Sequence, residues 1–388
     1  MKLTGLILVA CIAIANAAPL ISKPTGDVIP DSYIVVLKES NTAENFRGKF
    51  NAIARRQNGR GRPAVWDRAF KNALNGFSGS FNKAVLDELL ASDEVEFVEQ
   101  DRIVTISASQ PSPPSWGLSR VSSRNLAPGA PYVYQNAAGA GVTAYVIDTG
   151  ISVSHTDFGG RATSGANFIT GSPNTDENGH GTHVAGTIGG TRFGVAKRVN
   201  LVGVKVLNRQ GSGSFSGIIG GMDWVTQRAN SRSVVNMSLG GGKSAAVDAA
   251  VNRMVNKGIS LFVAAGNDAN ADACNGSPSG ATSAFTVAAS DSYDRLASFS
   301  SWGRCCDIIA PGVGITSAWI GGNSATRSIS GTSMATPHVA GVAALLISAE
   351  NLNGASAVYN RILSLSTPNK VSGNLRGTPN RLLFNGAQ

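Results

Sequence analysis

Three short segments contain side chains that could together perform nucleophilic catalysis. The first ends an apolar run at Asp148, the second contains His180, and the third contains Ser333. A hydroxyl can attack a carbonyl carbon when an imidazole takes its proton and a carboxylate orients that imidazole. The chain order Asp, His, Ser is one of the orders in which this triad occurs.

Each of these residues also has a plainer interpretation. Asp148 alone could be a helix cap or a metal ligand, and Ser333 alone is typical of a helix N-cap. His180 and His183 have the spacing of a metal-binding pair but lack the acidic residue of the HExxH motif. The joint occurrence of all three segments in order favours the triad.

The pattern of apolar residues around the three segments predicts the strands and helices that position them. Near-continuous apolar runs alternate with helical patterns, which indicates an α/β fold with a mainly parallel sheet covered on both faces. Chemistry in such folds gathers at the carboxyl ends of the strands. The predicted strands cover residues 142–147, 201–207, 234–239, 260–265, 285–289 and 308–309, and the predicted helices 215–228, 245–257 and 333–348.

Composition divides the 388 residues into two units after the N-terminal segment. Residues 18–108 have 12 basic and 12 acidic residues, whereas residues 109–388 have 20 and 12 and contain 39 of the 46 glycines. The sequence pattern of the first unit predicts a small α+β domain. Its strands are expected at 33–37, 76–81 and 95–98 and its helices at 46–56 and 86–90. The Ser- and Pro-rich composition of residues 107–115 predicts an extended, exposed linker or processing site. With 42% hydrophobic and 15% charged residues, the chain is not disordered.

The N-terminus predicts a cleaved secretory signal peptide. Lys2 precedes a short apolar run that ends in Ala15-Asn16-Ala17, and this run is too short for a membrane anchor. We therefore expect a secreted, extracellular protein. Three of the four cysteines remain after cleavage, so at most one internal disulfide forms.

The motifs resemble those of the subtilisin-like serine proteases, specifically the proteinase K-like, cuticle-degrading branch. The matching segments are Asp148-Thr-Gly150, His180-Gly-Thr-His-Val-Ala-Gly186 and Gly331-Thr-Ser-Met-Ala-Thr-Pro-His-Val-Ala-Gly341. The first unit resembles the I9-type inhibitory propeptide of these enzymes, and the resemblance covers nearly the whole chain after the signal. It implies a subtilisin-like three-layer fold behind a ferredoxin-like propeptide, and a self-processed serine endopeptidase.

The resemblance also implies residue roles beyond Asp148, His180 and Ser333. Asn267 corresponds to the oxyanion residue, and a preference for large apolar or aromatic side chains before the scissile bond follows from the small residues of the pocket, with no acid evident at its floor. The implied substrate-binding residues are Gly211, Ser212, Gly213, Phe215, Ser238, Leu239, Gly240, Ala264, Ala265 and Gly266.

The same resemblance implies a disulfide, a metal site and the domain boundaries. It implies a Cys274–Cys305 disulfide and a structural calcium ion held by Asp307 with the carbonyls of Thr282 and Ala284. The implied domains are a signal peptide at 1–17, a propeptide at 18–108 and a peptidase domain at 109–388. The expected partners are protein substrates and the chain's own propeptide. We expect a monomer, with no nucleic acid, membrane or organic cofactor.

Two alternatives remain open on the residues. The Gly331-Thr-Ser-Met-Ala335 segment loosely resembles the nucleophile elbow of α/β-hydrolase esterases, although the serine comes first in their chain order. The scaffold could also belong to a catalytically inactive binding protein. Hydrolysis of a peptide anilide, with and without a serine-directed inhibitor, distinguishes these possibilities.

Overall fold

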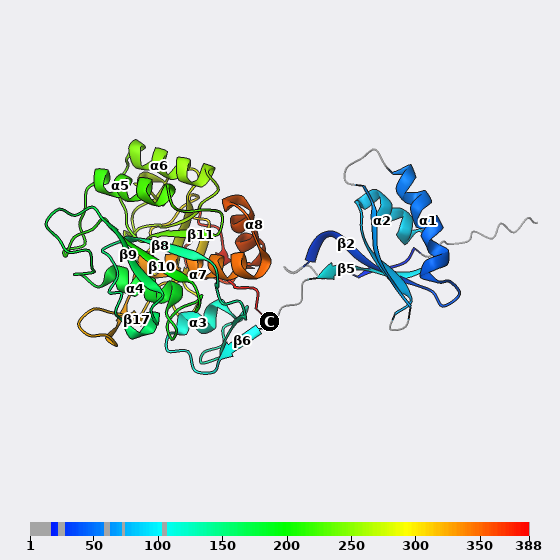
Figure 1. Ribbon diagram of the computed structural model, residues 1–388, viewed down its shortest axis with the longest axis horizontal. Coiled ribbons are helices and arrows are strands. Elements are labelled where there is room, and N and C mark those ends of the chain that lie inside the picture. Colours follow the sequence, from blue (N-terminus) through cyan, green and yellow to red (C-terminus); the bar gives the residue numbers. More distant parts are fainter. Residues whose placement is uncertain (1–16, 22–27, 58–62, 72–73, 103–106, 388) are drawn as a thin grey trace, which may run out of the picture. The chain divides into compact units, whose positions relative to one another are not determined.

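A computed structural model describes residues 17–21, 28–57, 63–71, 74–102 and 107–387. Contacts divide the chain between residues 104 and 105 into two units (Figure 1), four residues before the predicted boundary. The predicted signal peptide lies outside the described residues except for Ala17.

The first unit is a five-stranded sheet with two helices. Its strand order is β1-β5-β2-β4-β3, and only β1 and β5 pair in parallel. The strands are β1 (Leu20–Ile21), β2 (Val28–Leu37), β3 (Val65–Phe70), β4 (Gly76–Ser80) and β5 (Val95–Arg102), and the helices are α1 (Ala43–Arg56) and α2 (Lys83–Leu90). Strands β1 and β3 are additions that the sequence analysis did not predict.

Local sequence explains both helices of this unit. The side chains of Thr42 and Asn82 accept hydrogen bonds from backbone N–H groups at the starts of α1 and α2, as N-cap residues do. Phe46 and Phe50 share one face of α1 and are buried against Phe77 of β4. Aromatic burial therefore holds this small domain together.

The second unit is built on a nine-stranded sheet of order β19-β20-β16-β15-β13-β11-β8-β10-β9. Every pair is parallel except β19–β20. Its strands are β8 (Thr143–Asp148), β9 (Ala162–Asn167), β10 (Asn200–Lys205), β11 (Ser233–Met237), β13 (Ser260–Ala264), β15 (Phe285–Ser290), β16 (Ile308–Pro311), β19 (Thr367–Pro368) and β20 (Arg381–Leu382). All six predicted strands are present.

Helices cover both faces of this sheet because alternate strand residues point to opposite sides. Ala144 and Val146 of β8 pack into the core that contains the inner faces of α3, α4, α7 and α8, whereas Tyr145 and Ile147 pack into the core with α5 and α6. The helices are α3 (Trp116–Val121), α4 (His180–Gly189), α5 (Phe215–Thr226), α6 (Ala245–Asn256), α7 (Thr332–Glu350) and α8 (Ala355–Leu365).

Short elements complete the second unit. They are the strands β6 (Ser107–Gln110), β7 (Tyr132–Gln135), β12 (Gly241–Gly242), β14 (Gly276–Ser277), β17 (Ile315–Ala318) and β18 (Thr326–Ile329), and the 3-10 turns η1 (Thr156–Phe158) and η2 (Ala273–Asn275). Strand β6 lies in the segment predicted as an exposed linker. It pairs with β7 across Ala108 and Tyr134, so backbone hydrogen bonds fix this segment.

Helix α7 is the central helix of the core. It is long and apolar enough to cross a bilayer, with a mean hydropathy of 1.3 over its most apolar window, but 83% of that window is buried inside the protein. Its apolar character on all sides is therefore that of a core helix.

Candidate active site

Asp148 and His180 form the most direct contact of the site. Asp148 ends β8, between β10 and β11, and its side chain is fully buried. His180 begins α4, and its Nδ1 lies 2.8 Å from Asp148 Oδ1 and 3.0 Å from Oδ2. The Thr149 backbone N–H donates to Oδ1 as well. The buried carboxylate is thus held between an imidazole and a backbone amide.

A second buried carboxylate connects the two segments that carry this pair. Asp176 Oδ1 accepts from the Thr149 hydroxyl, next to Asp148, and from the Gly179 N–H, next to His180. Its Oδ2 accepts from the N–H and the hydroxyl of Thr182 in α4. The sequence analysis missed Asp176, because an acid in a loop carries no signal until its hydrogen-bond partners are known.

Lys205 is a second residue that the sequence analysis missed. It ends β10 in register with Asp148, and its side chain is fully buried. Its ammonium donates to the carbonyls of Thr149 and Leu207 and lies 3.7 Å from Glu177 Oε2. The turn that follows the Asp148 strand is therefore held by a buried positive charge.

The surroundings of His180 favour its protonated form. Burial lowers the pKa of His180, but the charge and hydrogen bond of Asp148, together with the charge of Asp176, outweigh burial and raise this pKa above 6.5. His183 differs, because burial lowers its pKa to about 4 and its Nε2 contacts the carbonyls of Ile315 and Arg327. His183 is therefore a neutral residue whose Nε2 donates to the carbonyls of two neighbouring strands.

Ser333 lies in the first turn of α7. Its hydroxyl donates to the Ser238 carbonyl at 3.2 Å, and the Ser238 hydroxyl donates to the Ser333 carbonyl at 2.8 Å. These two bonds fix the start of α7 against the end of β11. Among the described residues, Ser333 Oγ therefore makes a hydrogen bond to the Ser238 carbonyl and none to the imidazole of His180.

Asn267 follows β13 and faces the start of α7. Its Oδ1 accepts from the backbone N–H of Thr332 at 2.8 Å and from the Thr332 hydroxyl at 2.9 Å. A backbone N–H can only donate, so this contact identifies the oxygen of the amide. Asn267 and Ser333 line the same hollow.

Two adjoining hollows bring the predicted substrate residues together. One of about 780 Å³ is lined by His180, Ser238 and all four predicted residues of the 211–215 segment. The other, of about 450 Å³, is lined by Ala264, Ala265, Gly266, Asn267 and Ser333. Both hollows are lined by the strand-like segment Leu239-Gly240-Gly241. Phe215 is 38% exposed at the larger one.

Two acids line the smaller hollow, although the sequence suggested none there. Asp272 Oδ1 accepts from the Cys274 N–H at 2.8 Å, and Asp268 Oδ1 accepts from the Asn270 N–H at 2.9 Å. Both carboxylates thus cap local turns. Both acids follow Asn267 within five residues, so they reach this hollow in the same segment as the predicted residues 264–267.

Comparisons with known proteins identify the family of the chain. Residues 139–377 match the subtilase family, and residues 32–107 match the peptidase inhibitor I9 family. The chain belongs to the subtilase family. A cuticle-degrading serine protease of Arthrobotrys oligospora is 46% identical to this subtilase over 378 residues, which are 92% of this chain and 91% of the relative.

Further relatives support the same assignment. A cuticle-degrading protease of Metarhizium anisopliae is 44% identical over 379 residues, 96% of this subtilase and 94% of the relative. This subtilase is also similar to a solved structure, described as the crystal structure of a cold adapted subtilisin-like serine proteinase. The two chains share 50% sequence identity and superpose with a TM-score of 0.67, and the match covers 72% of this chain and all of the other. The subtilisin-like fold and the I9 propeptide are confirmed, and this subtilase is a serine endopeptidase. The esterase and inactive-protein alternatives are wrong.

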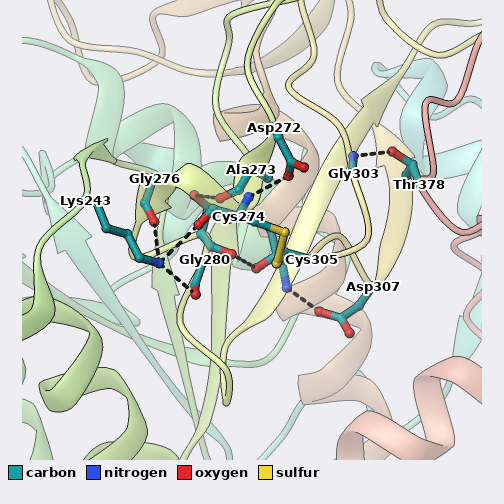
Figure 2. Close-up of a disulfide and its surroundings, with 12 residues drawn as sticks. Lys243, Asp272, Ala273, Cys274, Gly276, Gly280, Gly303, Cys305, Asp307 and Thr378 are labelled. Carbon is teal, nitrogen blue, oxygen red and sulfur yellow. Dashed lines mark hydrogen bonds between the residues drawn. A yellow bond between two sulfur atoms is a disulfide. The ribbon is translucent and has the colours of Figure 1, made fainter.

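One disulfide lies beside the smaller hollow of this subtilase. Cys274 of η2 is bonded to Cys305, with 5.3 Å between their Cα atoms (Figure 2). Cys306 is free and buried, and burial raises the pKa of its thiol to about 12. The Cys306 thiol is therefore protonated at neutral pH.

The predicted calcium ligands line a third hollow of this subtilase, of about 570 Å³. It contains Thr282, Ala284 and Asp307, and Asp307 Oδ2 accepts from the Thr286 N–H at 2.7 Å. Burial raises the pKa of Asp307 to about 6, against the effect of this hydrogen bond. In the described part of the chain, no three His, Cys, Asp or Glu side chains cluster as a metal site.

Proposed function

We propose that this subtilase is a secreted endopeptidase in which Ser333, His180 and Asp148 cleave peptide bonds through an acyl-enzyme. The supporting observation is the buried Asp148–His180 contact at the larger hollow, which adjoins the hollow that Ser333 and Asn267 line. Because Nδ1 of His180 faces the carboxylate, Nδ1 carries the proton of the neutral imidazole and Nε2 is the free base. Nε2 then takes the Ser333 proton and returns it to the leaving amine.

The developing negative charge needs donors at a fixed position. The NH2 group of Asn267 and the backbone N–H of Ser333 serve this role for the tetrahedral intermediate. The Thr332 contacts hold Asn267 Oδ1, so its NH2 group is oriented before substrate binds. Water later attacks the acyl-enzyme with His180 as base, which regenerates Ser333.

Substrate binds in this proposal as an extended strand along Gly211-Ser212-Gly213 and Ser238-Leu239-Gly240. Phe215 borders a second apolar subsite, and the smaller hollow receives the side chain before the scissile bond. Ala264, Ala265 and Gly266 leave room there for a large apolar or aromatic group. A panel of peptide anilides tests this preference and should include lysine and arginine, since Asp268 and Asp272 line the same hollow.

Processing provides the test of the triad. We expect cleavage of the signal after residue 17 and of the propeptide after Ala108, so that the secreted peptidase begins at Ser109 and is a monomer. Ser333→Ala should accumulate as a precursor and lose both anilide hydrolysis and fluorophosphonate labelling. A processed Ser333→Ala protein from a host without other proteases would contradict self-processing, and anilide hydrolysis by this variant would contradict the triad.

A structural calcium ion is part of the proposal. Calcium prefers oxygen ligands, and Asp307 with the carbonyls of Thr282 and Ala284 fits it. The three residues line one hollow, and within the described part of the chain a hydrogen bond is found at only one Asp307 carboxylate oxygen. The ion would offset the cost of burying the Asp307 charge and stabilise the loop before β15. Chelation should lower the melting temperature of the wild-type enzyme but not that of Asp307→Asn.

A further inference from the structure

Lys243 has an unusual environment for a half-exposed lysine. Its Nζ lies 3.1 Å from the carbonyl oxygen of Cys274, 3.3 Å from that of Gly276 and 2.9 Å from that of Gly280 (Figure 2). Asp248 Oδ2 of α6 lies 3.0 Å away. The three N–H donors of one ammonium thus face three carbonyls of a single curled segment, and a carboxylate neutralises the charge.

The segment that Lys243 holds, residues 274–280, is a wall of the smaller hollow. Asn275, Gly276 and Ser279 line the hollow from this wall, and Ala264 and Ala265 line the same hollow. The short pair β12–β14 joins the wall to Gly241 and Gly242, directly before Lys243. Lys243 therefore lies where two linings of the hollow meet.

The wall is wrapped closely around the ammonium. A Cβ atom at Gly280 would lie 2.6 Å from Lys243 Nζ and 2.2 Å from the Cys274 carbonyl oxygen, so only glycine allows this approach. Asp248 Oδ1 also accepts from the Ser277 hydroxyl, which ties the counter-charge to the same wall. Without the ammonium, three carbonyl oxygens would lose their shared donor and lie beside a carboxylate, so that only solvent would offset their mutual repulsion.

We propose that Lys243 is a positioning residue that serves as a built-in cation, holds residues 274–280 closed on the smaller hollow, and so determines the preference for large side chains before the scissile bond. The inference rests on the proposed function, which assigns that side chain to this hollow. Lys243 contacts none of the triad residues, so its effect should be on selectivity and leave the chemistry of Ser333 unchanged.

The test compares Lys243→Met with the wild-type enzyme on anilides with phenylalanine or alanine before the scissile bond. The Phe-to-Ala ratio of kcat/KM should fall about tenfold, mainly through KM for phenylalanine, because a looser wall forms fewer contacts with a large side chain. The rate of inactivation by diisopropyl fluorophosphate, which reports the triad alone, should stay within about twofold. Lys257→Met, at an exposed lysine after α6, is the matched control and should change neither measurement.

A rescue experiment tests the cationic role itself. In Lys243→Ala, propylammonium chloride should restore part of the selectivity, whereas tetramethylammonium chloride, which has the charge but no N–H donor, should not. Any other pattern overturns the cationic role. Lys243→Gln, which keeps an N–H donor without the charge, replaces Lys243→Met if that variant does not fold, and the same fall in the ratio is expected.

The outcomes separate this inference from the proposed function. An unchanged Phe-to-Ala ratio in Lys243→Met overturns the role of Lys243 and leaves the triad proposal standing. An equal fall in Lys257→Met also overturns it. Absence of any preference in the wild-type enzyme overturns the assignment of the hollow and the Lys243 inference with it, whereas loss of fluorophosphate reactivity in Lys243→Met shows a general disturbance and contradicts a role confined to the wall.

Discussion

The two sides of the candidate site are held by different means. Asp148 and His180 lie where a central strand ends and a helix begins, and the carboxylate of Asp176 and the ammonium of Lys205 fix that junction from inside the fold. Residues 274–280 belong to no long strand or helix. They are held by the Cys274–Cys305 disulfide and by the half-exposed Lys243.

This difference has a physical consequence. A carboxylate–imidazole pair must keep its geometry to within a fraction of an ångström, and buried hydrogen bonds in a rigid sheet provide that precision. A pocket wall can tolerate more movement, and the substitution of a single side chain can change how it contacts the substrate. We therefore expect changes on the triad side to reduce the rate, and changes on the wall to alter selectivity or stability.

The largest effect should come from Asp148→Asn. The variant keeps an oxygen for the Thr149 N–H but places a donor toward His180 Nδ1, which favours the wrong tautomer, so kcat should fall by about 10⁴-fold. Anilide hydrolysis after processing by a trace of active enzyme measures this. Asp223→Asn, at an exposed acid of α5, is the control, and a loss of less than tenfold in Asp148→Asn would show that the buried pair is not part of the chemistry.

The next largest effect should come from Asn267→Ala. Loss of one oxyanion donor costs about 10²–10³-fold in kcat, a size known from subtilisin itself, with KM nearly unchanged. Asn267→Asp separates the two functions of this side chain, because it keeps the acceptor for Thr332 but replaces the donor with a negative oxygen. Equal loss in both variants supports the donor role, and near-normal kcat in the aspartate variant contradicts it.

Sequence predicted the triad side of the site better than it predicted the wall. Asp148, His180, Ser333 and Asn267 lie at element ends that apolar periodicity locates, within motifs that resemble a known family. The supporting residues Asp176 and Lys205 were missed because the contacts that connect them to the Asp148 strand, both to Thr149, span 27 and 56 residues of sequence.

The wall was harder to predict for the same reason. Lys243 gave no signal, since three glycines before a lysine do not reveal which carbonyls surround it. Strand β6 was also missed, because Ser and Pro composition predicts an extended chain but not its pairing with β7. Composition and motifs locate local structure, whereas contacts between distant loops require the fold.

The disulfide on the wall should affect stability more than chemistry. Replacing both Cys274 and Cys305 by serine opens a loop of sequence separation 31 and should lower the free energy of unfolding by about 2–4 kcal/mol. Denaturant unfolding of the fluorophosphate-inhibited enzyme measures this without autolysis. A Cys306→Ala background prevents thiol exchange, and unchanged stability in that background would contradict a structural role for the bridge.

The smallest effect tests whether Asp176 acts by charge as well as by position. Activity requires neutral His180, so kcat/KM rises with pH as His180 loses its proton. Burial lowers the pKa of His180, and the charges of Asp148 and Asp176 raise it above its usual value. Removing one of these charges in Asp176→Asn should therefore move the acid limb of the pH profile to lower pH, while the lost hydrogen bonds reduce kcat by about tenfold.

Thr182→Val separates the two effects of Asp176. It removes a hydroxyl that donates to Asp176 Oδ2 and leaves the carboxylate in place, so kcat should fall without a shift of the acid limb. An acid limb that moves to higher pH in Asp176→Asn, or that moves equally in Thr182→Val, would mean that Asp176 contributes position alone. The activity of the triad side would then depend, like the selectivity of the pocket wall, on the contacts that hold its segments in place and not on the negative charge of Asp176.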